Sequence, residues 1–192
     1  MKVLSIIGSP RKQGNTAVLA GRFCETAEGL GAKTRTIFLN ELDFKGCQAC
    51  YACKTTRESC ILDDDLTPVL EAMHAADIML LGSPVYFHEV TGQFKLFWDR
   101  TFSLLTPDFL TGPKTCRLPT GKQVVFIQTQ AAAPELFADI FPRFAFMKDL
   151  FGLAGLHLLR GCGLQEPGQA SADAGLMAQA GQLAERLVGQ GR

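Results

Sequence analysis

Hydrophobic and polar residues along the chain follow two alternating periods. Five short, mainly apolar segments predict strands, and the first is apolar enough for a strand buried on both faces of a parallel sheet. The predicted strands are residues 2–7, 34–39, 77–81, 123–128 and 156–160. We expect the third strand to break at Gly82, Ser83 and Pro84, because these residues favour a turn.

Between the strands, apolar residues recur at helical spacing, as Val18, Leu19 and Phe23 do on one face of the first predicted helix. The predicted helices are residues 16–30, 66–73, 90–105, 135–151 and 173–188. The fourth helix must kink or divide at Pro142. The acidic run at residues 63–65 precedes the second helix, so we expect a helix cap and a solvated turn there rather than a metal site.

Five rounds of strand and helix predict an α/β fold with a doubly wound, five-stranded parallel sheet in the order 2-1-3-4-5 and helices on both faces. The 192 residues, 47% of them hydrophobic, fit a single domain over residues 1–192. A formal net charge of zero gives no electrostatic reason to expect nucleic acid as a partner. We expect a cytoplasmic protein with no membrane partner, because the apolar runs are strand-sized and the N-terminus is too brief for a signal peptide.

The loop after the first predicted strand, GSPRKQGNT at residues 8–16, carries groups suited to phosphate. In an open α/β sheet, ligands bind beyond the carboxyl ends of the strands, where the strand order reverses. Backbone N–H groups, a helix start, hydroxyls and cations would converge there on a dianion. The loop lacks both the Walker A and the G-x-G-x-x-G patterns, so a phosphate monoester fits better than a pyrophosphate. The alternative is a polar turn with a good helix cap.

The loop after the third strand, SPVYF at residues 83–87, adds an aromatic pair against which a flat heteroaromatic ring can pack. Three motifs together, GSPRxxGNT at 8–16, GSPVY at 82–86, and Lys95 with Asp99 and Arg100, resemble the NADPH-dependent FMN reductase family of flavodoxin-like proteins. The resemblance covers residues 1 to about 130. After the fourth strand the chain departs from the family's usual glycine-containing loop and reads TQAAAP at residues 129–134.

The resemblance implies an FMN site with NADPH or NADH as the donor. The implied cofactor-binding residues are Ser9, Arg11, Gln13, Asn15 and Thr16 at the phosphate and Pro84, Val85, Tyr86, Phe87 and Thr129 around the isoalloxazine ring. Lys95, Asp99 and Arg100 are expected to be helix and subunit-contact residues. A homodimer or homotetramer is also implied. The aromatic run Phe137, Phe141, Phe144 and Phe146 offers an apolar surface for it, although the same run can belong to the core.

Four cysteines, Cys47, Cys50, Cys53 and Cys60, occur in the loop at residues 46–60 after the second strand. In a reducing compartment such clustering favours a metal, a cluster or redox chemistry over disulfides. The loop should open at the carboxyl edge of the sheet, close to the flavin site. The spacing resembles the iron-sulfur flavoprotein branch of the family, in which four thiolates ligate a 4Fe-4S cluster. A zinc site and a loop of free thiols remain the alternatives.

We therefore expect an FMN-dependent oxidoreductase that relays electrons from a reduced donor, for example a ferredoxin-like protein, through FMN and a 4Fe-4S cluster to a small acceptor. One alternative is an NAD(P)H-dependent FMN or quinone reductase without a cluster. Another is a noncatalytic flavin electron carrier that serves a protein partner.

Overall fold

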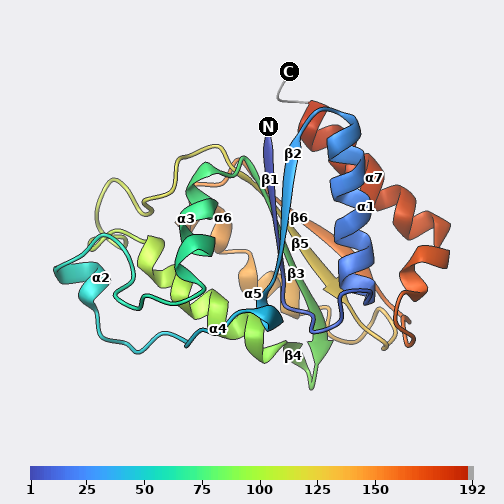
Figure 1. The fold of residues 1–192 in the computed structure, drawn as a ribbon, viewed down its shortest axis with the longest axis horizontal. Helices are drawn as coiled ribbons and strands as arrows, with labels where there is room; N and C mark the ends of the chain where they lie inside the picture. Colours follow the sequence, from blue (N-terminus) through green and yellow to red (C-terminus); the bar gives the residue numbers. More distant parts are fainter. Residues whose placement is uncertain (190–192) are drawn as a thin grey trace.

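In the computed structural model, which describes residues 1–189, a central sheet lies between two layers of helices (Figure 1). Its parallel strands are β1 (Lys2–Ile7), β2 (Lys33–Phe38), β3 (Ile78–Tyr86), β5 (Gln123–Thr129) and β6 (Gly155–Gly161). They lie in the order β2-β1-β3-β5-β6, and the short β4 (Glu89–Val90) pairs antiparallel with the end of β3. The predicted fold class and the order of the five parallel strands are confirmed.

The helices divide between the two faces of the sheet. On one face lie α1 (Asn15–Gly29) and α7 (Ala174–Gly189), and on the other lie α3 (Thr67–Ala75), α4 (Gly92–Arg100), α5 (Ile140–Phe144) and α6 (Met147–Leu150) (Figure 1). The short α2 (Ala52–Thr55) and the 3-10 turns η1 (Leu39–Glu41), η2 (Thr101–Leu104) and η3 (Gln169–Ala172) complete the described part. In β1, Val3 and Ile7 pack toward α1 and α7, whereas Leu4 and Ile6 enter the core on the other face. Strand β1 is therefore buried on both faces, as its apolar sequence requires.

The third strand is longer than the sequence indicates. Instead of breaking, β3 continues through Gly82, Ser83 and Pro84, which pair with residues 127–129 of β5. A Cβ atom at position 82 would lie 2.8 Å from the Thr16 side chain and 2.9 Å from that of Ile7, so glycine is required there by close packing rather than by a turn. This extension carries residues 84–86 beyond the end of β1.

The predicted helix at 90–105 is shorter, because Thr91 begins it and the chain tightens after Arg100. The Thr91 hydroxyl accepts a hydrogen bond from Phe94 N (3.3 Å) and donates one to Gly8 O (2.8 Å). It thereby joins the start of α4 to the loop after β1. The following residues form η2 instead of further α-helix.

The predicted helix at 135–151 divides into α5 and α6, as Pro142 requires. Pro142 lies in the first turn of α5, where its missing N–H has no helical partner to lose. Most of the aromatic run belongs to the core. Phe144 is buried, Phe137 and Phe141 are partly buried and pack against the core, and Phe146 is 51% exposed. Within residues 1–189 we find no helix both long and apolar enough to cross a membrane.

Candidate functional site

A cavity of about 140 Å³ lies at the carboxyl ends of β1, β3 and β5. Eight of the ten predicted flavin-site residues line it: Ser9, Arg11, Asn15, Thr16, Pro84, Val85, Tyr86 and Thr129. Gly14 and residues 130–131, 164–165 and 167 complete the wall, and sequence analysis did not single out the last five as contacts. Ligand pockets usually measure about 300–1,000 Å³, so a molecule the size of FMN would extend from this cavity over its rim.

The start of α1 opens into this cavity. Its N-cap residue is Gly14, and no side chain in the described part of the chain caps the helix. The loop instead closes on itself, since Ser9 Oγ accepts a hydrogen bond from Arg11 N (3.2 Å) and Gly14 N donates to Arg11 O (3.1 Å). The backbone N–H groups of the first helical turn have no intrahelical acceptor. They and the positive end of the helix dipole suit an anion such as a phosphate.

Asn15 and Thr16 are held by contacts of their own. Both ends of the Asn15 side chain are engaged, since Nδ2 donates to Glu166 O and Oδ1 accepts from Ala170 N, each at 2.9 Å. This leaves the backbone N–H of Asn15, rather than its amide, for a phosphate. The buried Thr16 hydroxyl lies 2.6 Å from the Thr129 hydroxyl, joining α1 to the end of β5.

Of the two aromatic residues predicted to contact the isoalloxazine ring, Tyr86 and Phe87, one lines the cavity. Tyr86 lines the wall and is 44% exposed, whereas Phe87 is 98% exposed and does not line it. Phe87 and His88 have φ values of +45° and +69°, so the tight β3–β4 turn directs the chain away from the cavity. Gln13 is also exposed outside the cavity. These are the two predicted site residues that the fold does not bring to it.

The loop after β5 is held in place by side chains. Gln130 Nε2 donates to Ala133 O and Leu136 O, both at 2.9 Å. Arg160 Nη1 donates to Pro134 O (2.9 Å), and its Nη2 donates to Gln130 Oε1 (3.1 Å). Sequence analysis missed both residues; the signal was a pair of polar side chains at the ends of two apolar strands.

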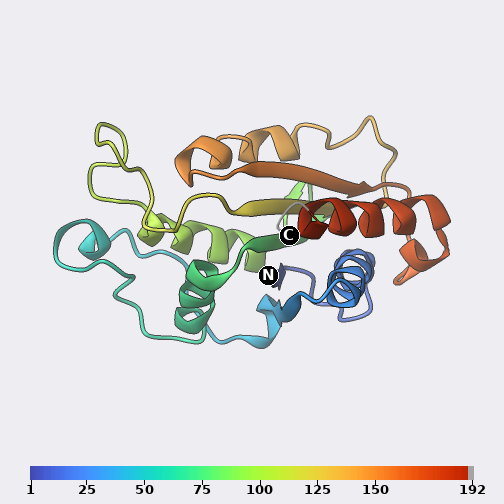
Figure 2. The ribbon, with the colours of Figure 1, turned by 90° about the horizontal axis from the view of Figure 1, so that it is seen from above.

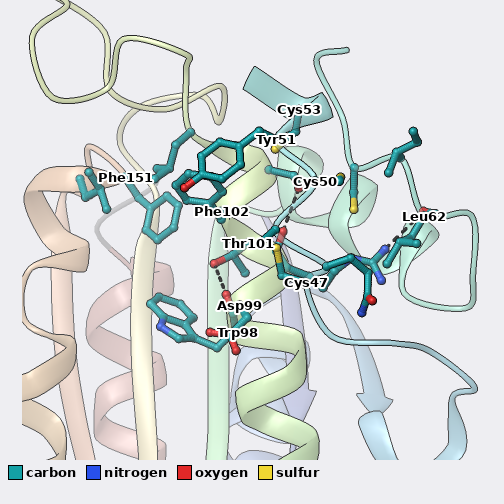
Figure 3. A pocket seen from close by; sticks show the side chains of 18 of the residues that line it. Cys47, Cys50, Tyr51, Cys53, Leu62, Trp98, Asp99, Thr101, Phe102 and Phe151 are labelled. Carbon is teal, nitrogen blue, oxygen red and sulfur yellow. Dashed lines mark hydrogen bonds between the residues drawn. The ribbon is translucent and has the colours of Figure 1, made fainter. Parts of the chain in front are cut away.

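The four cysteines line a second cavity, of about 440 Å³, between their own loop, the end of α4, η2 and α6. Figure 3 shows the rings of Tyr51, Phe102 and Phe151 on one side of this cavity and Cys47 and Cys50 on the other. The candidate metal ligands in this cavity are all thiols, which is the ligand type that iron-sulfur clusters use. However, among residues 1–189 no three Cys, His, Asp or Glu side chains are positioned to hold a metal ion. The sulfur atoms share a cavity without converging.

The cysteine cavity is separate from the first cavity, contrary to the expectation that the thiols lie close to the flavin residues. The two cavities share no lining residue. Figure 1 and Figure 2 both place α2 and α1 at opposite ends of the molecule. The reason is the long excursion of the chain after β2, which carries the cysteines past α4 before it returns to α3.

A buried ion pair supports the cysteine loop. Arg100, 1% exposed, donates from Nη1 to Asp64 Oδ2 (2.7 Å) and Lys45 O (2.8 Å), and from Nη2 to Asp64 Oδ1 (3.1 Å) and Leu62 O (3.3 Å). Burial alone would raise the pKa of Asp64, but the hydrogen bonds from Arg100 and from backbone N–H groups hold it below its ordinary value. Arg100 is therefore no subunit-contact residue, and Asp64 is an ion-pair partner rather than part of a solvated turn.

Residues 1–136 match the family described as NADPH-dependent FMN reductase, and this span includes the loop at 8–16, the end of β3 and the cysteine loop. The chain belongs to the NADPH-dependent FMN reductase family. Among its relatives, an iron-sulfur flavoprotein of Methanosarcina thermophila is 36% identical over 109 residues, which are 57% of this chain and 56% of the relative. Another, from Methanocaldococcus jannaschii, is 39% identical over 101 residues, 53% of this chain and 52% of the relative. The matched part thus spans about half the length of these curated relatives.

Solved structures share the fold of this FMN reductase family member. An NAD(P)H:quinone oxidoreductase from Methanothermobacter marburgensis superposes with a TM-score of 0.73 at 15% identity, covering 97% of this chain and 96% of that one. An FMN-dependent NADH-azoreductase from Bacillus anthracis, in complex with FMN, gives a TM-score of 0.69 at 15% identity, covering 98% and 100%. At such identities the likeness shows the flavodoxin-like fold alone.

Proposed function

We propose that the protein is an FMN-dependent oxidoreductase whose 192 residues form one FMN-binding domain. The FMN phosphate would lie against Ser9, Arg11 and the start of α1, and the isoalloxazine ring would lie at the rim beside Tyr86. The observation that carries this proposal is the uncapped helix start beside the Ser9–Arg11 loop, in the cavity to which the family's motifs contribute. Gln13 and Phe87 are left out of the proposed site, because both lie outside this cavity.

FMN, when bound, would supply hydride and single-electron chemistry that no side chain provides. The residues of this chain would bind and orient it. The helix start and Arg11 would neutralise the phosphate, and Thr16 with Thr129 would fix the spacing between α1 and β5. Gln130 and Arg160 would hold the loop at residues 130–136 in place. NADPH is the electron donor that the family description names, and NADH is the alternative.

The phosphate assignment is tested by comparing FMN with riboflavin, which lacks the dianion. Arg11→Ala should weaken FMN binding by about 10- to 150-fold, since one charge-assisted hydrogen bond contributes about 1.5–3 kcal/mol. Riboflavin binding should change little. Lys12→Ala is the matched control, because Lys12 forms a surface ion pair with Glu41 and lines neither cavity. Equal weakening of both ligands by Arg11→Ala would contradict the assignment.

We further propose that Cys47, Cys50, Cys53 and Cys60 ligate one 4Fe-4S cluster in the second cavity. Two observations support this: the four thiols line one cavity, and the curated relatives carry the name iron-sulfur flavoprotein. Ligation would require the cysteine loop to draw its sulfur atoms together around the cluster. Protein prepared without oxygen should then contain about four irons and four sulfides per chain. Stoichiometric zinc, or no metal after reconstitution with iron and sulfide, would favour the zinc or free-thiol alternative.

The donor distinguishes the remaining alternatives. Rapid bleaching of the flavin by NADPH would favour an NAD(P)H-dependent FMN or quinone reductase, whereas reduction by a ferredoxin-like protein alone would favour the relay to a small acceptor or a noncatalytic carrier. We place the protein in the cytoplasm, where a reducing environment keeps such thiols free. A homodimer or homotetramer is proposed from the family, and the exposed Phe146 and Tyr51 offer apolar contacts for it.

A further inference from the structure

The Arg100 guanidinium has one donor without a partner. Its two terminal nitrogens give hydrogen bonds to Asp64 and to two backbone carbonyls, but among the described residues Nε has no hydrogen-bond partner, although Arg100 is 1% exposed. A buried N–H without an acceptor is destabilising, so such groups nearly always have a partner when the protein is in its working state. Arg100 lines the cysteine cavity, so a group in this cavity can supply the acceptor.

The two carbonyls that Arg100 binds have a particular position in the chain. Lys45 O lies just before the segment that carries the four cysteines, and Leu62 O lies just after it. One side chain of α4 therefore holds both ends of the cysteine loop, and Asp64 keeps the guanidinium plane fixed by accepting from both terminal nitrogens.

The acceptor for Nε must be anionic or strongly polar and close to the loop. Cys60 lines the same cavity and is close enough to the guanidinium for a side-chain hydrogen bond as well as an electrostatic interaction. The carboxylate of Asp64 already has both oxygens engaged by the terminal nitrogens. A sulfur atom, either that of Cys60 or one of a bound cluster, is the acceptor that the donor set of this cavity offers.

We infer that Arg100 is a positioning residue of the cysteine site: it clamps both ends of the loop and donates its Nε–H to a sulfur atom in the cavity. Only the donation of Nε–H rests on the proposed cluster, and the clamp on the loop does not. Lysine cannot replace arginine here, because an ammonium group has no planar fork that spans Asp64 and two carbonyls.

The clamp is tested in metal-free protein by hydrogen exchange of residues 45–62. Arg100→Gln and Asp64→Asn should each accelerate exchange in this loop by about tenfold or more, since each removes part of the clamp. Lys95→Gln is the matched control: it removes an exposed ion pair with Asp99 on the same helix and should leave the loop unchanged. If loop exchange in Arg100→Gln equals that of the parent, the clamp is refuted. Arg100→Lys serves if the glutamine variant does not fold.

The hydrogen bond from Arg100 Nε is tested by measuring the midpoint potential of the cluster after anaerobic reconstitution. Arg100→Gln removes a positive donor and should disfavour reduction by about tenfold, a fall of about 59 mV for one electron. Asp64→Asn loosens the same loop but removes a negative charge, so the midpoint potential of the cluster in this variant should equal or exceed that of the parent. If the midpoint potential shifts in the same direction in both variants, or in neither, the hydrogen bond from Arg100 Nε to sulfur is refuted. If the parent binds no cluster, the proposed cluster and the donor both fail, while the exchange experiment still decides the clamp.

Discussion

The hydrogen bond between Thr16 and Thr129 joins the start of α1 to the end of β5. Both residues line the proposed flavin cavity, so removing this bond tests how they contribute to stability and to FMN binding. The two hydroxyl oxygens are 2.6 Å apart, and the side chains are 1% and 3% exposed. Valine has nearly the shape of threonine without its hydroxyl. Thr129→Val would therefore leave the Thr16 hydroxyl buried and unpaired, and Thr16→Val would do the same to Thr129.

Leaving one buried hydroxyl unpaired costs about 1–3 kcal/mol, whereas replacing both partners by apolar groups of the same shape is nearly neutral. Each single variant should therefore lose about 1–3 kcal/mol of unfolding free energy. The double variant should lie close to the parent. With a urea dependence of about 2 kcal/mol per M, the single variants should unfold at urea concentrations about 0.5–1.5 M lower.

The assay is urea unfolding of the flavin-free protein, followed by the fluorescence of Trp98, the single tryptophan. The same variants separate stability from binding. Two hydroxyls carry two protons and their mutual bond uses one, so the other can be donated to the phosphate. The double variant should therefore bind FMN about tenfold more weakly despite its normal stability. A double variant whose loss of stability equals the sum of the two single losses would refute the reasoning, because the two hydroxyls would then be energetically independent.

Three further predictions concern single side chains. Tyr86→Ala should alter flavin affinity or the visible spectrum, while Phe87→Ala, at a position 98% exposed and outside the cavity, should alter neither; equal effects would move the ring elsewhere. Cys50→Ser should abolish iron binding after anaerobic reconstitution but spare FMN, and Cys162→Ser, outside the cysteine cavity, should keep both; retained iron in the first variant would exclude Cys50 as a ligand. Burial raises the pKa of Cys24 from 9.0 to about 11, so the unfolded chain loses this proton first and stability should fall by up to about 3 kcal/mol between pH 9 and 11. Cys24→Ala should remove that part of the alkaline loss, and an unchanged pH dependence in this variant would contradict the shift.

The sheet was predictable because its signals are local. The central strands β1, β3 and β5 begin as short apolar runs, and the alternation with helices restricts the topology to few choices. The misplaced end of β3 shows the limit of this approach. Gly82, Ser83 and Pro84 favour a turn locally, but pairing with β5 and the close approach of Thr16 keep them extended.

The flavin cavity was predictable as far as it follows from loops at the ends of adjacent strands. Phe87 does not line this cavity, because residues 87 and 88 adopt positive φ in a hairpin turn that the sequence does not reveal. Arg100 and Asp64 were misjudged for a different reason. Their pairing joins residues 36 positions apart, and no local pattern distinguishes a buried ion pair from two surface charges.

A crystal structure of the protein prepared with FMN shows directly where the flavin binds. We predict the phosphate within hydrogen-bond distance of the Ser9 and Arg11 side chains and of the backbone N–H groups at the start of α1, with the isoalloxazine ring beside Tyr86. Binding of FMN in the cysteine cavity, or with its phosphate away from the start of α1, would contradict the account.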